Sequence, residues 1–338
     1  MKYNSLDKRN NRNTKPKIID GVLKMKYQVI CVILLLVIIF LFLSKTNNVV
    51  TNKEYFLLSP TVSSIEKNNR LINFQELRNS LVQKYEKNDD YLISIYFEYI
   101  PTGSNISINK DVKMWPASLI KIPIAMAAFK KIEERKWKLN NELVILDDDK
   151  DSEFGELYKK SSGTTFSIKK LLEETLINSD NTAHFVLLRN LDSVELEDVY
   201  TRLGFDDEID KLKQSPNDGQ YDDNRITAKK YTTFFRSLYN ATYLSPEYSQ
   251  MFLNILAESP KELISTGLPS GITYVHKTGV RISERVKADS GIVYVPGRPY
   301  LITVMIEQSK VGNFDQEEID NLFEEISREI YSYVAQSN

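Results

Sequence analysis

The chain has 338 residues, of which 44 are Lys or Arg and 46 are Asp or Glu, and it contains two His and one Cys. A net charge of −2 gives no electrostatic case for nucleic-acid binding, and the few His and Cys residues argue against a disulfide and against a multi-ligand zinc or iron–sulfur site. The apolar fraction of 42% is enough for a buried core, so we expect a globular protein whose chemistry runs on Ser, Lys, Asp, Glu, Asn or Tyr, without a metal or an organic cofactor.

The first expected element is a membrane-spanning helix. Fifteen consecutive apolar residues run from Val29 to Leu43, and with residues 27 and 28 the segment would reach ~26 Å as a helix, near the short end of what crosses a hydrocarbon core. Eight Lys or Arg residues and only two acidic residues precede it, so the positive-inside rule keeps the N-terminus in the cytoplasm. A cleaved signal peptide is the alternative, but residues 44–48 offer no small-x-small cleavage site, and we expect an uncleaved anchor.

These features divide the chain into four parts. Residues 1–26 form a basic cytoplasmic segment, residues 27–43 the transmembrane anchor, residues 44–70 a polar linker, and residues 71–338 a large exported domain. The protein is thus expected in the cell membrane as a single-pass, monomeric protein with the large domain outside the cytoplasm.

The exported domain begins with a helix and a β-hairpin. Apolar residues recur at helical spacing from Phe74 to Tyr85, and residues 91–99 then alternate as a strand that turns into a second strand at 105–108. Three further strands are expected only near the end of the chain, at 273–277, 291–295 and 300–306, and an amphipathic helix with an apolar stripe from Ile319 to Ile330 follows them. The residues from about 115 to 263 have the pattern of helices and loops.

This order predicts an α+β fold. The two ends of the domain would meet in one antiparallel five-stranded sheet flanked by the N-terminal and C-terminal helices, and the middle would form an inserted helical lobe. A groove between the lobe and the sheet is the expected place for a functional site.

The first candidate motif is Ser118-x-x-Lys121. The same spacing occurs at four other serines, so the spacing alone means little, but here an apolar run that suits a buried helix follows it. Residues three apart share a helix face, so Lys121 can reach the Ser118 hydroxyl. A lysine buried away from water can lose its proton near neutral pH and activate a serine. The alternative is a helix cap beside a solvent-facing lysine.

Two further motifs follow along the chain. Ser179-Asp180-Asn181 comes after a helix-like run, and Lys277-Thr278-Gly279 stands at the end of an expected strand. Alone, the first is commonly a helix cap and the second a strand that ends in a turn. They occur in order after Ser118, however, with gaps of 61 and 98 residues, and this conjunction predicts a shared site.

With these three motifs the sequence resembles the serine β-lactamase and penicillin-binding-protein superfamily, and most closely its class A β-lactamase-like branch. The resemblance extends from residue 71 to the last residue and includes the order of the motifs, the split sheet and the run from Ala288 to Arg298. It implies a β-lactamase-like fold and a serine hydrolase that forms a covalent acyl-enzyme.

The resemblance also implies catalytic roles. Ser118 would attack the substrate carbonyl, Lys121 would help to activate it, and Ser179 would relay a proton to the leaving nitrogen. The backbone N–H groups of Ser118 and Val280 would form the oxyanion hole. Asp180 is expected to be structural.

For substrate binding, the resemblance implies that Asn181 holds a side-chain amide and that Lys277 and Thr278, followed by Gly279, hold a carboxylate. Lys287 or Arg281 are candidates for a further cation near that carboxylate, although an exposed cation at a strand end is the simpler interpretation. His184 is expected to pack in the interior. Neither it nor His276 has a convincing partner for a Ser-His-Asp triad, so lysine-based activation is expected.

One element of the resembled family is missing. Class A β-lactamases carry a Glu-x-x-Leu-Asn string whose Glu activates the deacylating water, and this chain has none. Spacing makes Asp210 the best-placed substitute, with Gln214 in the place of the Asn and Glu208 as the next candidate. Solvent-facing acids in an acidic loop are the alternative.

The expected function is therefore the opening of β-lactams by an exported, membrane-anchored serine hydrolase through an acyl-enzyme on Ser118. A D-alanyl-D-alanine carboxypeptidase or a related cell-wall peptidase remains an alternative, as does a penicillin-binding module that acylates without turnover or a wall-binding protein without catalysis. The expected partner is a β-lactam or a D-alanyl-D-alanine-type small substrate, with no nucleic acid. Fold alone does not separate these functions.

Overall fold

The computed structural model describes residues 25–26, 28–37, 72–205 and 225–336, and its contacts divide the chain into two units, Met1–Glu54 and Tyr55–Asn338. In the first unit, residues 28–37 of the expected anchor are helical, and residues 38–43 lie outside the described residues. Among the helices in the described ranges, none is both long and apolar enough to cross a membrane. The anchor therefore stays a prediction from the sequence.

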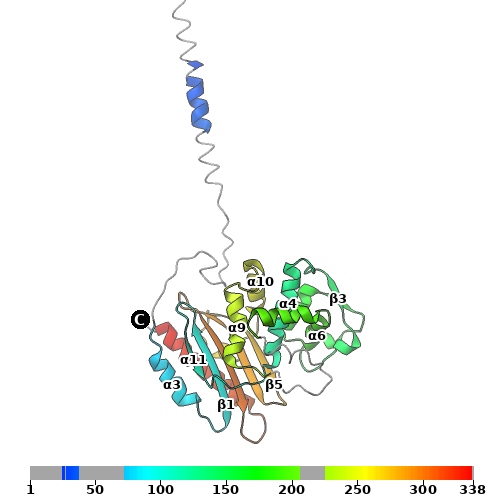
Figure 1. Ribbon diagram of the computed structural model, residues 1–338, viewed down its shortest axis with the longest axis vertical. Coiled ribbons are helices and arrows are strands. Elements are labelled where there is room, and N and C mark those ends of the chain that lie inside the picture. Colours follow the sequence, from blue (N-terminus) through cyan, green and yellow to red (C-terminus); the bar gives the residue numbers. More distant parts are fainter. Residues whose placement is uncertain (1–24, 27, 38–71, 206–224, 337–338) are drawn as a thin grey trace, which may run out of the picture. The chain divides into compact units, whose positions relative to one another are not determined.

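A five-stranded antiparallel sheet lies at the centre of the second unit (Figure 1). Its strand order is β2-β1-β7-β6-β5. The strands are β1 Tyr91–Tyr99, β2 Ser104–Ile108, β5 Thr273–Arg281, β6 Val286–Tyr294 and β7 Tyr300–Gln308. β1 pairs with β7 along its whole length, from Tyr91 opposite Gln308 to Tyr99 opposite Tyr300. The predicted α+β fold, in which the two ends of the domain meet in one sheet, is confirmed.

The hairpin of β5 and β6 is longer than the sequence indicated. β5 continues to Arg281 and β6 begins at Val286, five residues before the expected start at residue 291. The added part of β6 carries Lys287, Asp289 and Ser290, all of them buried. Because these buried side chains are polar, they interrupt the apolar alternation by which a strand is recognised in a sequence.

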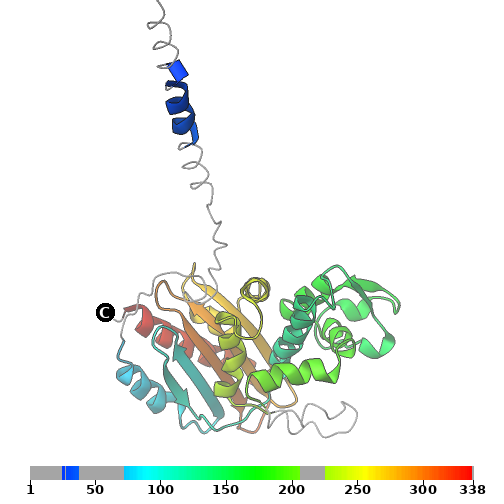
Figure 2. The same cartoon turned by 45° about the horizontal axis from the view of Figure 1, so that its top comes forward.

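Helices cover both faces of the sheet (Figures 1 and 2). α3 Gln75–Tyr85 and α11 Gln316–Gln336 pack on one face, where Leu81 and Phe323 share a core with Phe97 of β1. α9 Ala228–Tyr239 packs on the other face. Successive side chains of a strand point to opposite faces of the sheet, so the side chains of β1 pack in turn against the helices on each face.

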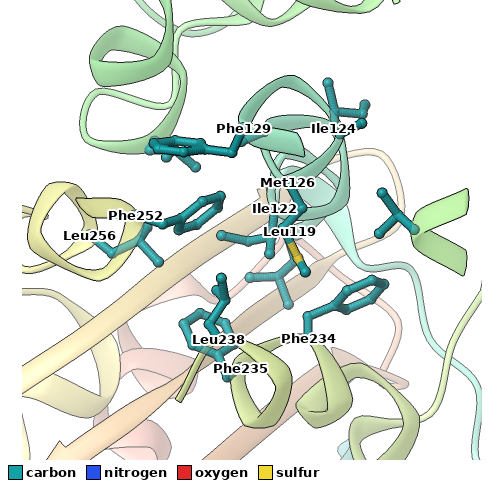
Figure 3. Packing of buried hydrophobic residues seen from close by; sticks show 14 of the residues in the cluster. Leu119, Ile122, Ile124, Met126, Phe129, Phe234, Phe235, Leu238, Phe252 and Leu256 are labelled. Atoms are coloured by element: carbon teal, nitrogen blue, oxygen red, sulfur yellow. The ribbon is translucent and has the colours of Figure 1, made fainter. Parts of the chain in front are cut away.

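The helical lobe is built around α4, which spans Lys121–Glu133 and is buried at ten of its thirteen residues. Figure 3 shows Phe129 of α4 beside Phe252 of α10, with ring centroids 5.0 Å apart, and Leu119 and Ile122 in the same core. The remaining helices of this region are α5 Ile168–Leu176, α6 Asn181–Arg189, α7 Ser193–Arg202 and α10 Pro246–Leu256.

The middle of the domain also contains two short strands, which corrects the expectation of helices and loops alone. β3 Glu142–Val144 pairs antiparallel with β4 Thr165–Ser167. Each has three residues, which is too short for a repeat of apolar and polar side chains to stand out in the sequence. The short helices η1 Ala117–Ile120, η2 Asp147–Asp149, η3 Leu157–Lys159 and η5 Leu263–Gly267 complete the described elements.

Candidate active site

Ser118 and Lys121 lie where one turn of 3-10 helix passes into the central helix of the lobe. η1 spans Ala117–Ile120 and α4 begins at Lys121, so Pro123 falls in the first helical turn, where its missing N–H does no harm. Ala117 has a φ of 49°, a left-handed conformation that is uncommon outside glycine and carries an energetic cost.

The amino group of Lys121 is the centre of a hydrogen-bond network. Its Nζ lies 3.3 Å from Ser118 Oγ and 3.3 Å from Ser179 Oγ, and it donates to the Ser179 carbonyl at 2.5 Å and to Asn181 Oδ1 at 2.6 Å. The expected contact between Lys121 and Ser118 is confirmed. The fold also brings the second motif, which is distant in sequence, to Lys121. The Nζ of Lys121 therefore lies between the hydroxyl groups of Ser118 and Ser179.

Burial changes the protonation of Lys121. The residue is 2% exposed, and this burial, aided by the positive charge of Lys277, lowers its pKa to about 7. The carboxylates of Asp180 and Asp151 act in the opposite direction. A substantial fraction of Lys121 is therefore neutral at physiological pH, as a proton acceptor for a serine must be.

Asp180 holds the second motif in shape. Its Oδ1 accepts from the backbone N–H of Ala183 at 2.8 Å and caps α6, and its Oδ2 accepts from the N–H groups of Glu156 at 2.7 Å and Leu157 at 2.9 Å. Because both carboxylate oxygens accept hydrogen bonds from backbone N–H groups, Asp180 has the expected structural role. Ser179, with a φ of 54°, is thereby fixed beside Lys121.

Asp151 is a site residue that the sequence did not reveal. Its Oδ1 accepts from Asn181 Nδ2 at 2.9 Å, while the Oδ1 of Asn181 faces Lys121. The amide is therefore oriented from both ends. Asp151 follows an acidic stretch in a loop thirty residues before Asn181, and nothing local in the sequence distinguishes it from a solvated acid.

The third motif lies on β5, the edge strand that faces η1. Gly279 approaches η1 so closely that a Cβ added there would lie 2.8 Å from the backbone nitrogen of Ser118 and 2.9 Å from the carbonyl oxygen of Pro116. Only glycine fits without displacing one of the two backbones. Val280 is the next residue along the strand, so the backbone of β5 lies beside the Ser118 amide, as an oxyanion hole made by Ser118 and Val280 requires.

Lys277 and Thr278 precede this contact. Lys277 is 2% exposed, its Nζ donates to the Thr278 carbonyl at 2.9 Å, and burial lowers its pKa to about 8. The Thr278 hydroxyl donates to Oε2 of Glu262 at 3.2 Å. Glu262 is a second residue of this region that the sequence did not single out.

The two histidines do not take part in the network of Lys121. Nδ1 of His276 lies 3.0 Å from Asp289 Oδ1, and its Nε2 lies 3.2 Å from the carbonyl oxygen of Pro260. His184 is buried, and desolvation with the charge of Lys121 lowers its pKa to about 3, so it is a neutral core residue as expected.

The two cations considered for the carboxylate have other partners. Lys287 donates to Asp320 Oδ1 of α11 at 2.6 Å. The guanidinium of Arg281 lies over the ring of Trp115, 4.4 Å from its centroid. Lys287 is therefore paired with a carboxylate of this chain, whereas the stacking of Arg281 leaves its N–H groups available.

Asp210 and Glu208, the candidates for activating the deacylating water, lie outside the described residues, as does Gln214. Within the ranges that the structure does describe, no carboxylate oxygen is hydrogen-bonded to Ser118 or Lys121. The described residues thus place the side chains of all three motifs, while the candidates for activating the deacylating water are not placed.

Comparison with known proteins agrees with this architecture. The model of the Beta-lactamase enzyme family matches residues 74–334. A β-lactamase of Bacillus subtilis (strain 168) is 24% identical over 250 residues, which cover 71% of this chain and 79% of that protein. The structure of PBP-A superposes with a TM-score of 0.68 at 23% identity, covering 78% of this chain and 98% of PBP-A. A mutant of PBP-A, solved as its acyl-enzyme complex with penicillin G, gives a TM-score of 0.67 at 23% identity, covering 76% and 95%.

The fold and the three motifs define a protein of the serine β-lactamase and penicillin-binding-protein superfamily. Because the family model matches most of its length, the chain belongs to the beta-lactamase enzyme family.

Proposed function

We propose that this protein is a serine hydrolase that opens β-lactams through a covalent acyl-enzyme on Ser118. The observation that carries the proposal is the position of Lys121, whose Nζ lies 3.3 Å from the hydroxyls of both Ser118 and Ser179 and whose pKa is lowered to about 7. A PBP-A mutant of the same fold has been captured as an acyl-enzyme with penicillin G, which supports a β-lactam as the first substrate to test.

The geometry of the site supports the following acylation step. Neutral Lys121 accepts the Ser118 proton while Oγ forms a bond to the lactam carbonyl carbon, and the resulting oxyanion is held by the N–H groups of Ser118 and Val280. The C–N bond then breaks, and the leaving nitrogen receives a proton from Lys121 through the Ser179 hydroxyl. The product is an ester on Ser118, and water must cleave it to complete a turnover.

The second candidate is a D-alanyl-D-alanine peptidase or a penicillin-binding module with slow turnover. It is favoured by the lack of a Glu-x-x-Leu-Asn string in the sequence and by the likeness in fold to PBP-A. Both candidates share the acylation step. They differ in whether water then cleaves the ester on Ser118 quickly or slowly.

Mass spectrometry of the full-length protein with penicillin G tests the proposal. We expect a covalent adduct on Ser118 that Ser118→Ala abolishes. Ser107→Ala is the matched control, since Ser107 has a Lys at the same spacing but lies on β2, and this variant should keep the adduct. An adduct on another serine, or none, would contradict the proposal. A stable adduct without released product would favour the penicillin-binding alternative.

We also propose that residues 27–43 anchor the enzyme in the cell membrane with the catalytic domain outside. The support is the apolar run from Val29 to Leu43 and the excess of basic residues before it. Protease added to intact cells should then remove the catalytic domain and leave residues 1–26 protected. Catalytic domain recovered from the medium with an N-terminus shortly after Leu43 would contradict the anchor.

A further inference from the structure

A carboxylate already occupies the place where a substrate carboxylate would be bound. In the proposed function, the Thr278 hydroxyl and the charge of Lys277 receive that group, yet the Thr278 hydroxyl donates to Oε2 of Glu262 at 3.2 Å. Glu262 is exposed, so a substrate entering beside Thr278 meets its negative charge directly.

Glu262 is held at this position from both sides. Two residues before it, the carbonyl of Pro260 lies 3.2 Å from Nε2 of His276. Two residues after it, the N–H of Ile264 donates to Oδ2 of Asp289 at 3.1 Å. Asp289 is fully buried, and its other oxygen lies 3.0 Å from Nδ1 of the same His276. The backbone on both sides of Glu262 is therefore bonded to β5 and β6 of the sheet.

Lys277 is the cation next to Thr278 in the sequence, and its charge interacts with Glu262. Lys277 is buried, and the Glu262 carboxylate opposes the lowering of its pKa. Lys287 is paired with Asp320 of α11, and Arg281 is stacked on Trp115, a contact that leaves its positive charge in place. A substrate carboxylate beside Thr278 would therefore compete with Glu262 for Lys277 and be repelled by the Glu262 carboxylate.

We propose that Glu262 is a specificity-determining residue that disfavours acyl donors with a free carboxylate beside the scissile bond and favours donors that are neutral there, such as an ester or an amide. The inference rests on the proposed function, because it assumes acylation at Ser118 with Thr278 next to the bound group. It predicts that selectivity between charged and neutral donors changes, while the chemistry at Ser118 stays the same.

The test compares penicillin G with its methyl ester, which lacks the negative charge. The second-order rate of Ser118 acylation is measured by mass spectrometry on the full-length protein, and the readout is the ratio of the acid rate to the ester rate. Glu262→Gln should raise this ratio about tenfold, the size expected for removing one partly screened like charge at a few ångströms. Glu258→Gln, an equal charge change at an exposed residue of the preceding segment, should leave the ratio as in the wild type.

Ionic strength gives a second readout. Raising salt should increase the acid-to-ester ratio of the wild type, because it screens the repulsion, and should do so much less in Glu262→Gln. Adducts at Ser118 with the same ratio in the wild type and in Glu262→Gln would overturn the inference alone. The absence of any adduct would overturn the proposed function and this inference with it.

Discussion

Gly279 and Ser118 meet backbone to backbone, since a Cβ added to Gly279 would lie 2.8 Å from the Ser118 nitrogen. Gly279 belongs to the edge strand of the sheet and Ser118 to the turn that begins the central helix of the lobe. Ser118 is therefore positioned by both parts of the domain. In the proposed mechanism, the distance between β5 and η1 decides whether the backbone N–H groups of Ser118 and Val280 can bind the same oxyanion.

Gly279→Ala should disable acylation without unfolding the protein. The added methyl group forces β5 and η1 apart, which moves Val280 away from the Ser118 amide. Loss of one oxyanion-hole donor typically costs about 10²–10³ in rate, so we expect the rate of acylation by penicillin G to fall by roughly this factor. Stopped-flow measurement with a chromogenic cephalosporin would give the rate.

Gly103→Ala is the control for that substitution. Gly103 has a φ of 71° in the turn between β1 and β2, and an added Cβ there meets no atom within 4 Å. The change should lower stability by about 1 kcal/mol and leave the acylation rate unchanged. If Gly279→Ala acylates as fast as the wild type, the close contact has no catalytic role.

The acylation rate should have a bell-shaped dependence on pH. Lys121 must be neutral to accept the Ser118 proton, so the rate rises with pH through about 7, the pKa to which burial lowers this lysine. Lys277 must be charged to attract a carboxylate, so the rate falls above about 8, the pKa of its buried ammonium. Lys121→Arg, which stays charged throughout, should abolish acylation. A rate constant that is flat from pH 6 to 9 would contradict the assignment of Lys121 as the base.

Lys121 should also weaken the folded state at neutral pH. Its pKa is about 7 in the folded protein and about 10.4 in an unfolded chain, so the unfolded chain binds more protons between these values and this lysine's contribution to stability rises with pH there. At pH 7 the penalty is up to about 4 kcal/mol, partly offset by the four hydrogen bonds of the amino group.

Lys121→Met removes this pH dependence. We expect the inactive variant to have a higher free energy of unfolding than the wild type at pH 7, and the difference to shrink as the pH approaches 10. Urea denaturation at the two pH values measures both quantities. A difference that does not change with pH would show that Lys121 is not a partly deprotonated group in the folded protein.

Turnover of β-lactams should be slow, with a burst of product followed by a lower steady rate. The chain lacks the Glu-x-x-Leu-Asn string, and Asp210, its best-placed substitute by spacing, has a side chain one methylene shorter than Glu. A general base is typically worth about 10²–10⁴ in rate, so Asp210→Asn should lengthen the lifetime of the acyl-enzyme while the burst amplitude stays the same.

Glu208→Gln is the matched comparison for Asp210→Asn, because both remove one negative charge from the same stretch. It should leave the lifetime unchanged, as measured by the decay of the adduct mass. If Glu208→Gln lengthens the lifetime and Asp210→Asn does not, Glu208 is the group that activates the water. If neither variant has an effect, both are surface acids.

The sequence by itself determined the fold class and the contact between Ser118 and Lys121. Alternation in residues 91–99 and 300–306 and the helical stripes at both ends of the domain follow from local periodicity, so the sheet and its flanking helices were predictable. Ser118 and Lys121 are three residues apart, and helical geometry alone brings their side chains together. The roles of Ser179 and Lys277 were inferred from resemblance and the order of the motifs.

Only the tertiary structure decided what surrounds that pair. Asp151 orients Asn181, and Glu262 contacts Thr278, although neither residue belongs to a motif. The lowered pKa of Lys121 likewise requires its burial beside Lys277, a residue that reaches it only when β5 packs against the lobe. Such contacts join residues that are far apart in the chain and depend on how the sheet and helices pack. Local periodicity carries no information about them, and the charges that set the chemistry of Ser118 are fixed only by folding.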